Sequence, residues 1–108
     1  EVVDAVHGKA DVVVDSGFTR GTDILKALAL GARAVGLGKL QAWALVAGGK
    51  EGIIRMLEIL EEEMTVSMGL LGVTRLDQLD PSFLHPAAPV TPPGEFSPFP
   101  SLEKHVRK

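Results

Sequence analysis

Near the start of the chain the spacing of hydrophobic positions changes from a helical pattern to a continuous run. Residues 1–8 carry valines on one side of a helical turn and a glycine at the stop position, which predicts the last turns of an amphipathic helix. Residues 11–15, DVVVD, form a continuous β-branched run instead of an alternating one. Such a run is typical of a parallel strand buried on both faces, and we expect it to end at Ser16 and Gly17.

The pattern then repeats with a helix and a second strand. Residues 21–30 predict a short helix, with Thr22 or Asp23 as the N-terminal cap and Gly31 as the stop. Residues 34–38 predict a short strand whose two glycines indicate close approach of backbone or ligand. Alternating elements with short connections predict an α/β fold with a parallel sheet and right-handed crossovers, as in a barrel or a doubly wound sheet.

Helical spacing dominates the next part of the chain. A helix is expected from residue 41 to 47, an interruption at Gly48 and Gly49, and a long amphipathic helix over 51–71. Its predicted apolar stripe consists of Ile53, Leu57, Leu60, Met64, Met68 and Leu71. The glutamates at positions 58 and 61–63 lie largely off this stripe, which predicts a solvated face that carries no chemistry.

The regular structure is expected to close soon afterwards. Gly72 should end the long helix, residues 74–79 predict one more helical turn, and Asp80-Pro81 should end the regular elements. Most of the seven prolines lie in residues 86–100, together with Phe96 and Phe99. We therefore divide the chain into a folded part, 1–85, and an extended proline-rich tail, 86–108, whose phenylalanines favour docking on this subunit or a neighbour.

Composition narrows the class of protein. The 45% hydrophobic and 23% charged content is that of a core-forming chain, but 108 residues fall well short of the roughly 250 of a complete (β/α)8 barrel. Because the chain starts within an element, we expect a fragment or one chain of a processed protein, with an ordinary short helix at a true start as the alternative. The net charge of −3 and the scattered basic residues argue against nucleic acid as a partner.

The absent residue types and patterns set further limits. The chain has no cysteine, which excludes disulfides and thiolate metal sites and permits a reducing compartment, with the cytoplasm as the default. Its longest apolar stretch is too short and too interrupted for a membrane span, and no signal pattern stands at the start.

Candidate chemistry is concentrated in the two loops that follow the predicted strands, residues 15–21 and 36–39. Ligands of parallel sheets lie at the carboxyl ends of the strands, where small residues let backbone N–H groups and helix N-termini reach an anion. Arg20 and Lys39 can add full positive charges. This combination favours a phosphate site, as in the last two loops of many (β/α)8 barrels. The alternative is that the glycines only allow tight turns and that Arg20 pairs with Asp23 or Glu51.

Residues 15–39, DSGFTRGTDILKALALGARAVGLGK, resemble the C-terminal FMN-binding signature of the FMN-dependent 2-hydroxy-acid dehydrogenases and oxidases. The likeness continues through residues 44–49, 51–52 and 70–84. It implies the last two β/α units of a (β/α)8 TIM barrel, FMN as cofactor, and oxidation of a 2-hydroxy acid to the 2-oxo acid by the complete protein. It also implies that the remainder of the barrel lies on another chain or an upstream segment, within a homo-oligomer.

The resemblance implies that cofactor contacts come from Asp15, Ser16, Gly17, Thr19, Arg20, Gly38 and Lys39. The family's first loop usually reads Asp-Gly-Gly-x-Arg-Arg-Gly-Thr-Asp, and its second reads Gly-Arg-Pro. Ser16 replaces a glycine, and Thr19 and Lys39 replace arginines. Because arginine grips phosphate with a planar fork and lysine with a point charge, we expect a looser hold on the phosphate.

No catalytic residue or metal ligand is predicted in this chain. The family's catalytic base is a histidine in a His-Gly-Gly-Arg stretch upstream of the matching region, and His7, His85 and His105 do not match that motif. The chain also has no tyrosine to match the family's substrate-binding tyrosines. Two other interpretations remain: a fragment of another phosphate-binding barrel of the inosine-monophosphate dehydrogenase type, or a cofactor-free assembly piece.

Overall fold

The structure is a computed structural model that describes residues 1–87 of the chain. Its elements are α1 (Val2–Val6), β1 (Val13–Asp15), α2 (Gly21–Ala29), β2 (Ala34–Gly36), α3 (Gly38–Leu71), and the 3-10 turns η1 (Leu76–Gln78) and η2 (Pro81–Phe83). The predicted order of helix, strand, helix, strand and long helix is confirmed. The predicted proline-rich tail lies almost wholly outside the described residues.

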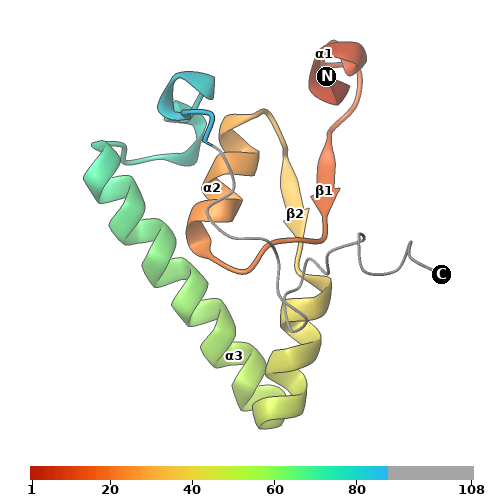
Figure 1. Ribbon diagram of the computed structural model, residues 1–108, viewed down its shortest axis with the longest axis vertical. Helices are drawn as coiled ribbons and strands as arrows, with labels where there is room; N and C mark the ends of the chain where they lie inside the picture. The colour runs from red at the N-terminus through yellow and green to blue at the C-terminus, as the bar shows by residue number, and fades with distance from the viewer. Residues whose placement is uncertain (88–108) are drawn as a thin grey trace, which may run out of the picture.

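The two strands form a parallel pair, as expected. Val13 pairs with Ala34, Val14 with Val35, and Asp15 with Gly36, so both carboxyl ends lie at one edge of the sheet (Figure 1). The expected burial of the first strand is wrong for this chain by itself, since Val13 is 63% exposed. Within residues 1–87 the sheet has two strands, which leaves β1 with a neighbour on one edge.

Helix α3 consists of two arms, residues 38–47 and 50–71, joined at a sharp bend. Gly48 and Gly49 have non-helical backbone angles, and the φ of +57° at Gly49 favours glycine. Figure 1 shows the arms folding back on each other in a V. A side-chain carbon on Gly52 would overlap the carbonyl group of Ala44, so the arms touch near the bend. The predicted interruption at these glycines is confirmed.

The first arm begins at Gly38, three residues before the expected start. Leu37 already occupies the cap position, and β2 ends at Gly36 instead of continuing to residue 38. Gly38 and Lys39 therefore lie in the first turn of a helix, where the sequence predicted the end of a strand and a loop. This shift matters for the site, because it places the N–H groups of both residues at a helix N-terminus.

The second arm packs on α2 and forms the core with it. One cluster of buried side chains joins Phe18, Ile24, Met56 and Leu60; a second joins Leu25, Ala29, Val73 and Leu79. The predicted stripe is partly wrong, since Leu57 is 50% and Leu71 42% exposed while Met56 is buried. The buried side of the second arm thus includes Met56, a position that the sequence pattern did not single out.

The C-terminal end of α3 and the turns after it follow the prediction with one difference. Gly72, with φ of +74°, ends the helix, and η1 is the expected extra turn. Asp80-Pro81 does not close the regular structure, because the Asp80 carboxylate accepts a hydrogen bond from the Ser82 N–H and starts η2.

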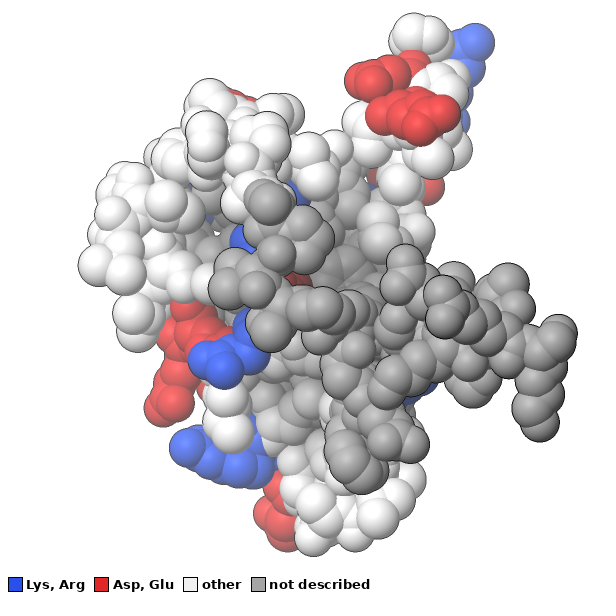
Figure 2. Space-filling model, in the orientation of Figure 1, with Lys and Arg blue, Asp and Glu red and all other residues white. Residues whose placement is uncertain are grey.

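Charged side chains of both signs lie next to one another along the outer side of α3 in Figure 2, which fits their scattered distribution in the sequence. In the part of the chain that the structure describes, no helix combines the length and the apolar character that crossing a membrane requires.

Candidate functional site

The loop after β1 turns sharply at two successive residues with left-handed backbone angles. Ser16 has φ of +74° and Gly17 has φ of +90°. The Ser16 N–H donates to Oδ1 of Asp15 at 2.8 Å, which fixes the start of the turn. Few residues other than glycine adopt such angles, so the backbone explains why the family resemblance has glycine at the position of Ser16.

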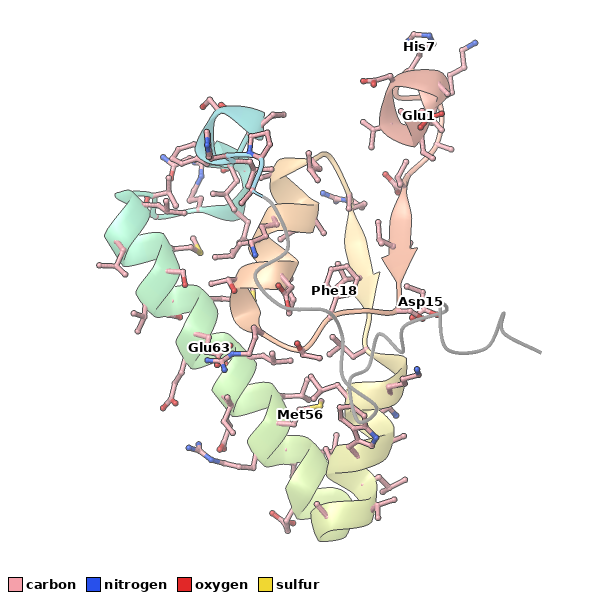
Figure 3. All side chains as sticks on the ribbon, viewed as in Figure 1. Glu1, His7, Asp15, Phe18, Met56 and Glu63 are labelled. Atoms are coloured by element: carbon pink, nitrogen blue, oxygen red, sulfur yellow. The ribbon has the colours of Figure 1, made fainter. Side chains whose placement is uncertain are left out.

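The Asp15 carboxylate lies over the neighbouring strand. A side-chain carbon on Gly36 would overlap this carboxylate, so Gly36 provides the space in which it sits. Asp15 pairs with Gly36 in the sheet register. The segment that follows Asp15 and the segment that follows Gly36 therefore start at the same edge of the sheet. Figure 3 shows Asp15 beside the beginning of α3.

The N-terminus of α3 has backbone donors without acceptors inside the helix. The first N–H groups of any helix lack an intrahelical acceptor, and Leu37 at the cap position supplies no side-chain hydrogen bond. Gly38 faces open space, since a side-chain carbon there would meet nothing within 4 Å. The partial positive charge of the helix end and the exposed Lys39 next to it suit an anion at this edge.

The N-terminus of α2, by contrast, is already occupied by carboxylates of this chain. Oδ2 of Asp23 accepts from the N–H groups of Thr19 at 3.3 Å and Arg20 at 3.1 Å. Oε2 of Glu63 accepts from the N–H of Gly21 at 2.7 Å. The cap residue is Arg20, and the expectation of Thr22 or Asp23 at that position is wrong: Asp23 acts from the third helical position.

The side chains of Thr19 and Arg20 are held by the same two carboxylates. Nη2 of Arg20 lies 2.7 Å from Oε1 of Glu63, so neither Asp23 nor Glu51 is the partner of its guanidinium group. The Thr19 hydroxyl donates to Oδ2 of Asp23 at 3.4 Å. The predicted site residues therefore separate into two groups, with Thr19 and Arg20 engaged at α2.

The other group lies together at the carboxyl edge of the sheet: Asp15, Ser16, Gly17, Gly38 and Lys39. This edge offers backbone donors, a lysine and one carboxylate. Among residues 1–87 no group of three or more histidine, aspartate or glutamate side chains is arranged to hold a metal ion.

Glu63 is the functional candidate that the sequence did not reveal. The prediction of a solvated glutamate run is wrong at this position, where the side chain is 22% exposed and both oxygens are bonded. Its contact with Gly21 spans 42 positions of sequence, so no local pattern could have shown it. Figure 3 shows Glu63 on α3 facing the start of α2.

Parallel strands joined through a helix define a piece of an α/β protein, with its candidate site at the carboxyl ends of the strands. The family model described as FMN-dependent dehydrogenase matches residues 1–86, and the chain belongs to this family. The resemblance found in the sequence is thereby confirmed.

Individual relatives show how much of a family member the chain covers. It is 48% identical over 85 residues to an L-lactate oxidase from Nostoc sp., covering 79% of this chain and 23% of the oxidase. A mandelate oxidase variant solved with a monooxide FMN adduct is 45% identical, with a TM-score of 0.69 over 72% of this chain and 25% of that one. The flavin-binding domain of flavocytochrome b2 from baker's yeast is 37% identical, with a TM-score of 0.73, covering 99% of this chain and 28% of that one. The chain thus spans about a quarter of these relatives.

Proposed function

We propose that this chain is the phosphate-binding part, the last two β/α units, of a (β/α)8 barrel that uses FMN to oxidise a 2-hydroxy acid to the 2-oxo acid. The observation that carries the proposal is the meeting of the Ser16–Gly17 turn and the uncapped N-terminus of α3 at one sheet edge. Family membership supplies the cofactor, and lactate and mandelate, the substrates that the relatives' names contain, are both 2-hydroxy acids.

The donors at this edge fit a phosphate group. Backbone N–H groups near Gly17 and Gly38 are available beyond the ends of the strands, and Gly38 leaves room for a close approach. Lys39 adds a positive charge beside them. Asp15 can only accept hydrogen bonds when ionised, so it suits hydroxyl groups of the cofactor and not its phosphate.

Thr19 and Arg20 have a different place in this proposal. Their contacts with phosphate stay predictions, and each would first have to leave a carboxylate to which it is bonded, Asp23 or Glu63. We assign both residues to the support of the loop.

In this proposal the cofactor, the residues of this chain and the rest of the barrel have separate roles. FMN, when bound, supplies an acceptor for the equivalent of a hydride. The residues described above bind and orient its phosphate end, and the catalytic base belongs to the rest of the barrel. The exposed valines of β1 give that remainder an apolar strand to cover. Homo-oligomer formation and a cytoplasmic location stay predictions.

The test is a spectrum of the complete protein. We expect a yellow protein whose released cofactor has the mass of FMN, and whose flavin absorbance bleaches when a 2-hydroxy acid such as lactate or mandelate is added without oxygen. A colourless protein that binds a purine nucleotide would favour the inosine-monophosphate dehydrogenase type of barrel. A colourless protein that binds neither ligand would favour the assembly piece.

A further inference from the structure

We propose that Glu63 is a positioning residue for the phosphate loop, which here means residues 16–20. It holds this loop from α3, the same helix whose N-terminus forms the other side of the anion edge. The inference rests on the proposed FMN function and adds a residue that lies outside both loops.

The contacts of Glu63 are directed at the end of the phosphate loop. Its two carboxylate oxygens bond separate groups: Oε1 the guanidinium of Arg20 and Oε2 the N–H of Gly21, each at 2.7 Å. Gly21 is buried, and Glu63 is largely shielded from solvent. A charge-assisted bond in such surroundings is shorter and stronger than one between neutral groups.

Packing at Gly21 makes this support rigid. A side-chain carbon on Gly21 would lie 2.7 Å from Cβ of Glu63, 2.7 Å from the carbonyl oxygen of Leu60 and 2.8 Å from the backbone nitrogen of Met64. The backbone of α2 therefore rests directly on the second arm of α3. The loop is fixed by β1 at one end and by this contact at the other.

The bend in α3 connects the two sides of the site. The first arm starts at Gly38, on the anion edge, and the second arm returns along α2 to place Glu63 under Gly21 (Figures 1 and 3). The position of the phosphate loop relative to Gly38 is thus set through one helix. The carboxylate also takes the place that an anion would occupy at the N-terminus of α2, which leaves the N-terminus of α3 for the phosphate.

The experiment compares the affinities of the complete protein for FMN and for riboflavin, which lacks the phosphate. For Glu63→Ala we expect FMN to bind about 10-fold more weakly, the effect of losing one charged hydrogen bond, while riboflavin binding changes less than about twofold. Glu63→Gln can still accept from Gly21, so its loss should be smaller. Glu61→Ala is the matched control, because Glu61 is exposed on the same arm.

Each outcome decides the inference. Equal losses for both flavins would show a general structural role and overturn it, and so would an unchanged or tighter affinity for FMN. If Glu63→Ala does not fold, the same comparison is made with Glu63→Gln, which must then weaken FMN and not riboflavin. If the wild-type protein binds FMN no better than riboflavin, the proposed phosphate site itself is wrong. If the wild type prefers FMN and the Glu63 variants keep this preference, only the role of Glu63 is wrong.

Discussion

The guanidinium of Arg20 lies 2.7 Å from the carboxylate of Glu63 and joins the start of α2 to the second arm of α3. The arginine side chain is 68% exposed, so the charge pair itself contributes little to stability. The bond that the Gly21 N–H donates to the same carboxylate is part-buried and therefore contributes more. Stability at this junction should therefore depend on Gly21 more than on the charge of Arg20.

Replacing Gly21 with alanine should destabilise the protein by about 1–3 kcal/mol, because the added carbon would meet backbone atoms of Leu60 and Met64 that cannot rotate away. The measurement is the midpoint of urea unfolding. The control is Gly69→Ala, in α3 with open space around it, where we expect about 0.5–1 kcal/mol of stabilisation. Equal shifts in the two variants would contradict the close packing of α2 on α3.

Alanine at Gly49 should cost about 1–3 kcal/mol, because the combination of φ +57° and ψ −140° is open almost only to glycine. Gly48→Ala is the matched control one residue earlier. Its φ of −151° is negative, which L-residues can adopt, and its surroundings are open, so we expect a smaller loss of stability than at Gly49. Thermal unfolding of the two variants measures the difference, and a tolerant Gly49 would mean that the bend does not require this conformation.

Thr19→Arg and Lys39→Arg should each tighten FMN binding several-fold, since a planar guanidinium can form two parallel bonds with a phosphate. Fluorescence titration of the complete protein with FMN gives the dissociation constants. Lys50→Arg, the same exchange at the bend of α3, serves as the control and should leave the affinity unchanged. If the affinity for FMN is unchanged in both variants, then Thr19 and Lys39 do not weaken the hold on the phosphate, and the hypothesis is wrong.

The pKa of the Asp80 carboxyl is held below its ordinary value by hydrogen bonds from the Ser82 side chain and backbone. A carboxyl whose pKa is lower in the folded protein stabilises the fold above its unfolded pKa and loses that contribution as the pH falls through the folded pKa. Ser82→Ala removes the larger cause and should raise the pKa of Asp80 toward its ordinary value. Carbon-detected NMR titration of the carboxyl group measures this directly. Identical titration midpoints in the two proteins would show that the hydroxyl does not contribute.

The order of elements was predictable because short-range signals specify it. The β-branched run before Ser16, the glycine pair at 48 and 49, and Gly72 each act through local backbone preference, and all three were located correctly. The start of α3 was missed because Gly38, Lys39 and Leu40 carry no capping residue before them that would mark a helix.

The candidate site was predictable only in its loops. Glu63 was assigned to a solvated run because three adjacent glutamates look alike in sequence, and only the contact with α2 distinguishes the last of them. The buried face of the second arm was misjudged because Met56 and Leu57 are adjacent apolar residues, and only the packing buries Met56 and leaves Leu57 exposed.

The bend also limits how the number of residues between Gly49 and Glu63 can vary. Glu63 follows Gly49 by 14 residues (63 minus 49), close to four helical turns. One inserted residue would rotate Glu63 by about 100° around the arm and move it about 1.5 Å along the axis, away from Gly21. Related proteins that keep this contact should therefore show no single-residue insertions or deletions between the bend and this glutamate, whereas the segment beyond Gly72 is free of that constraint.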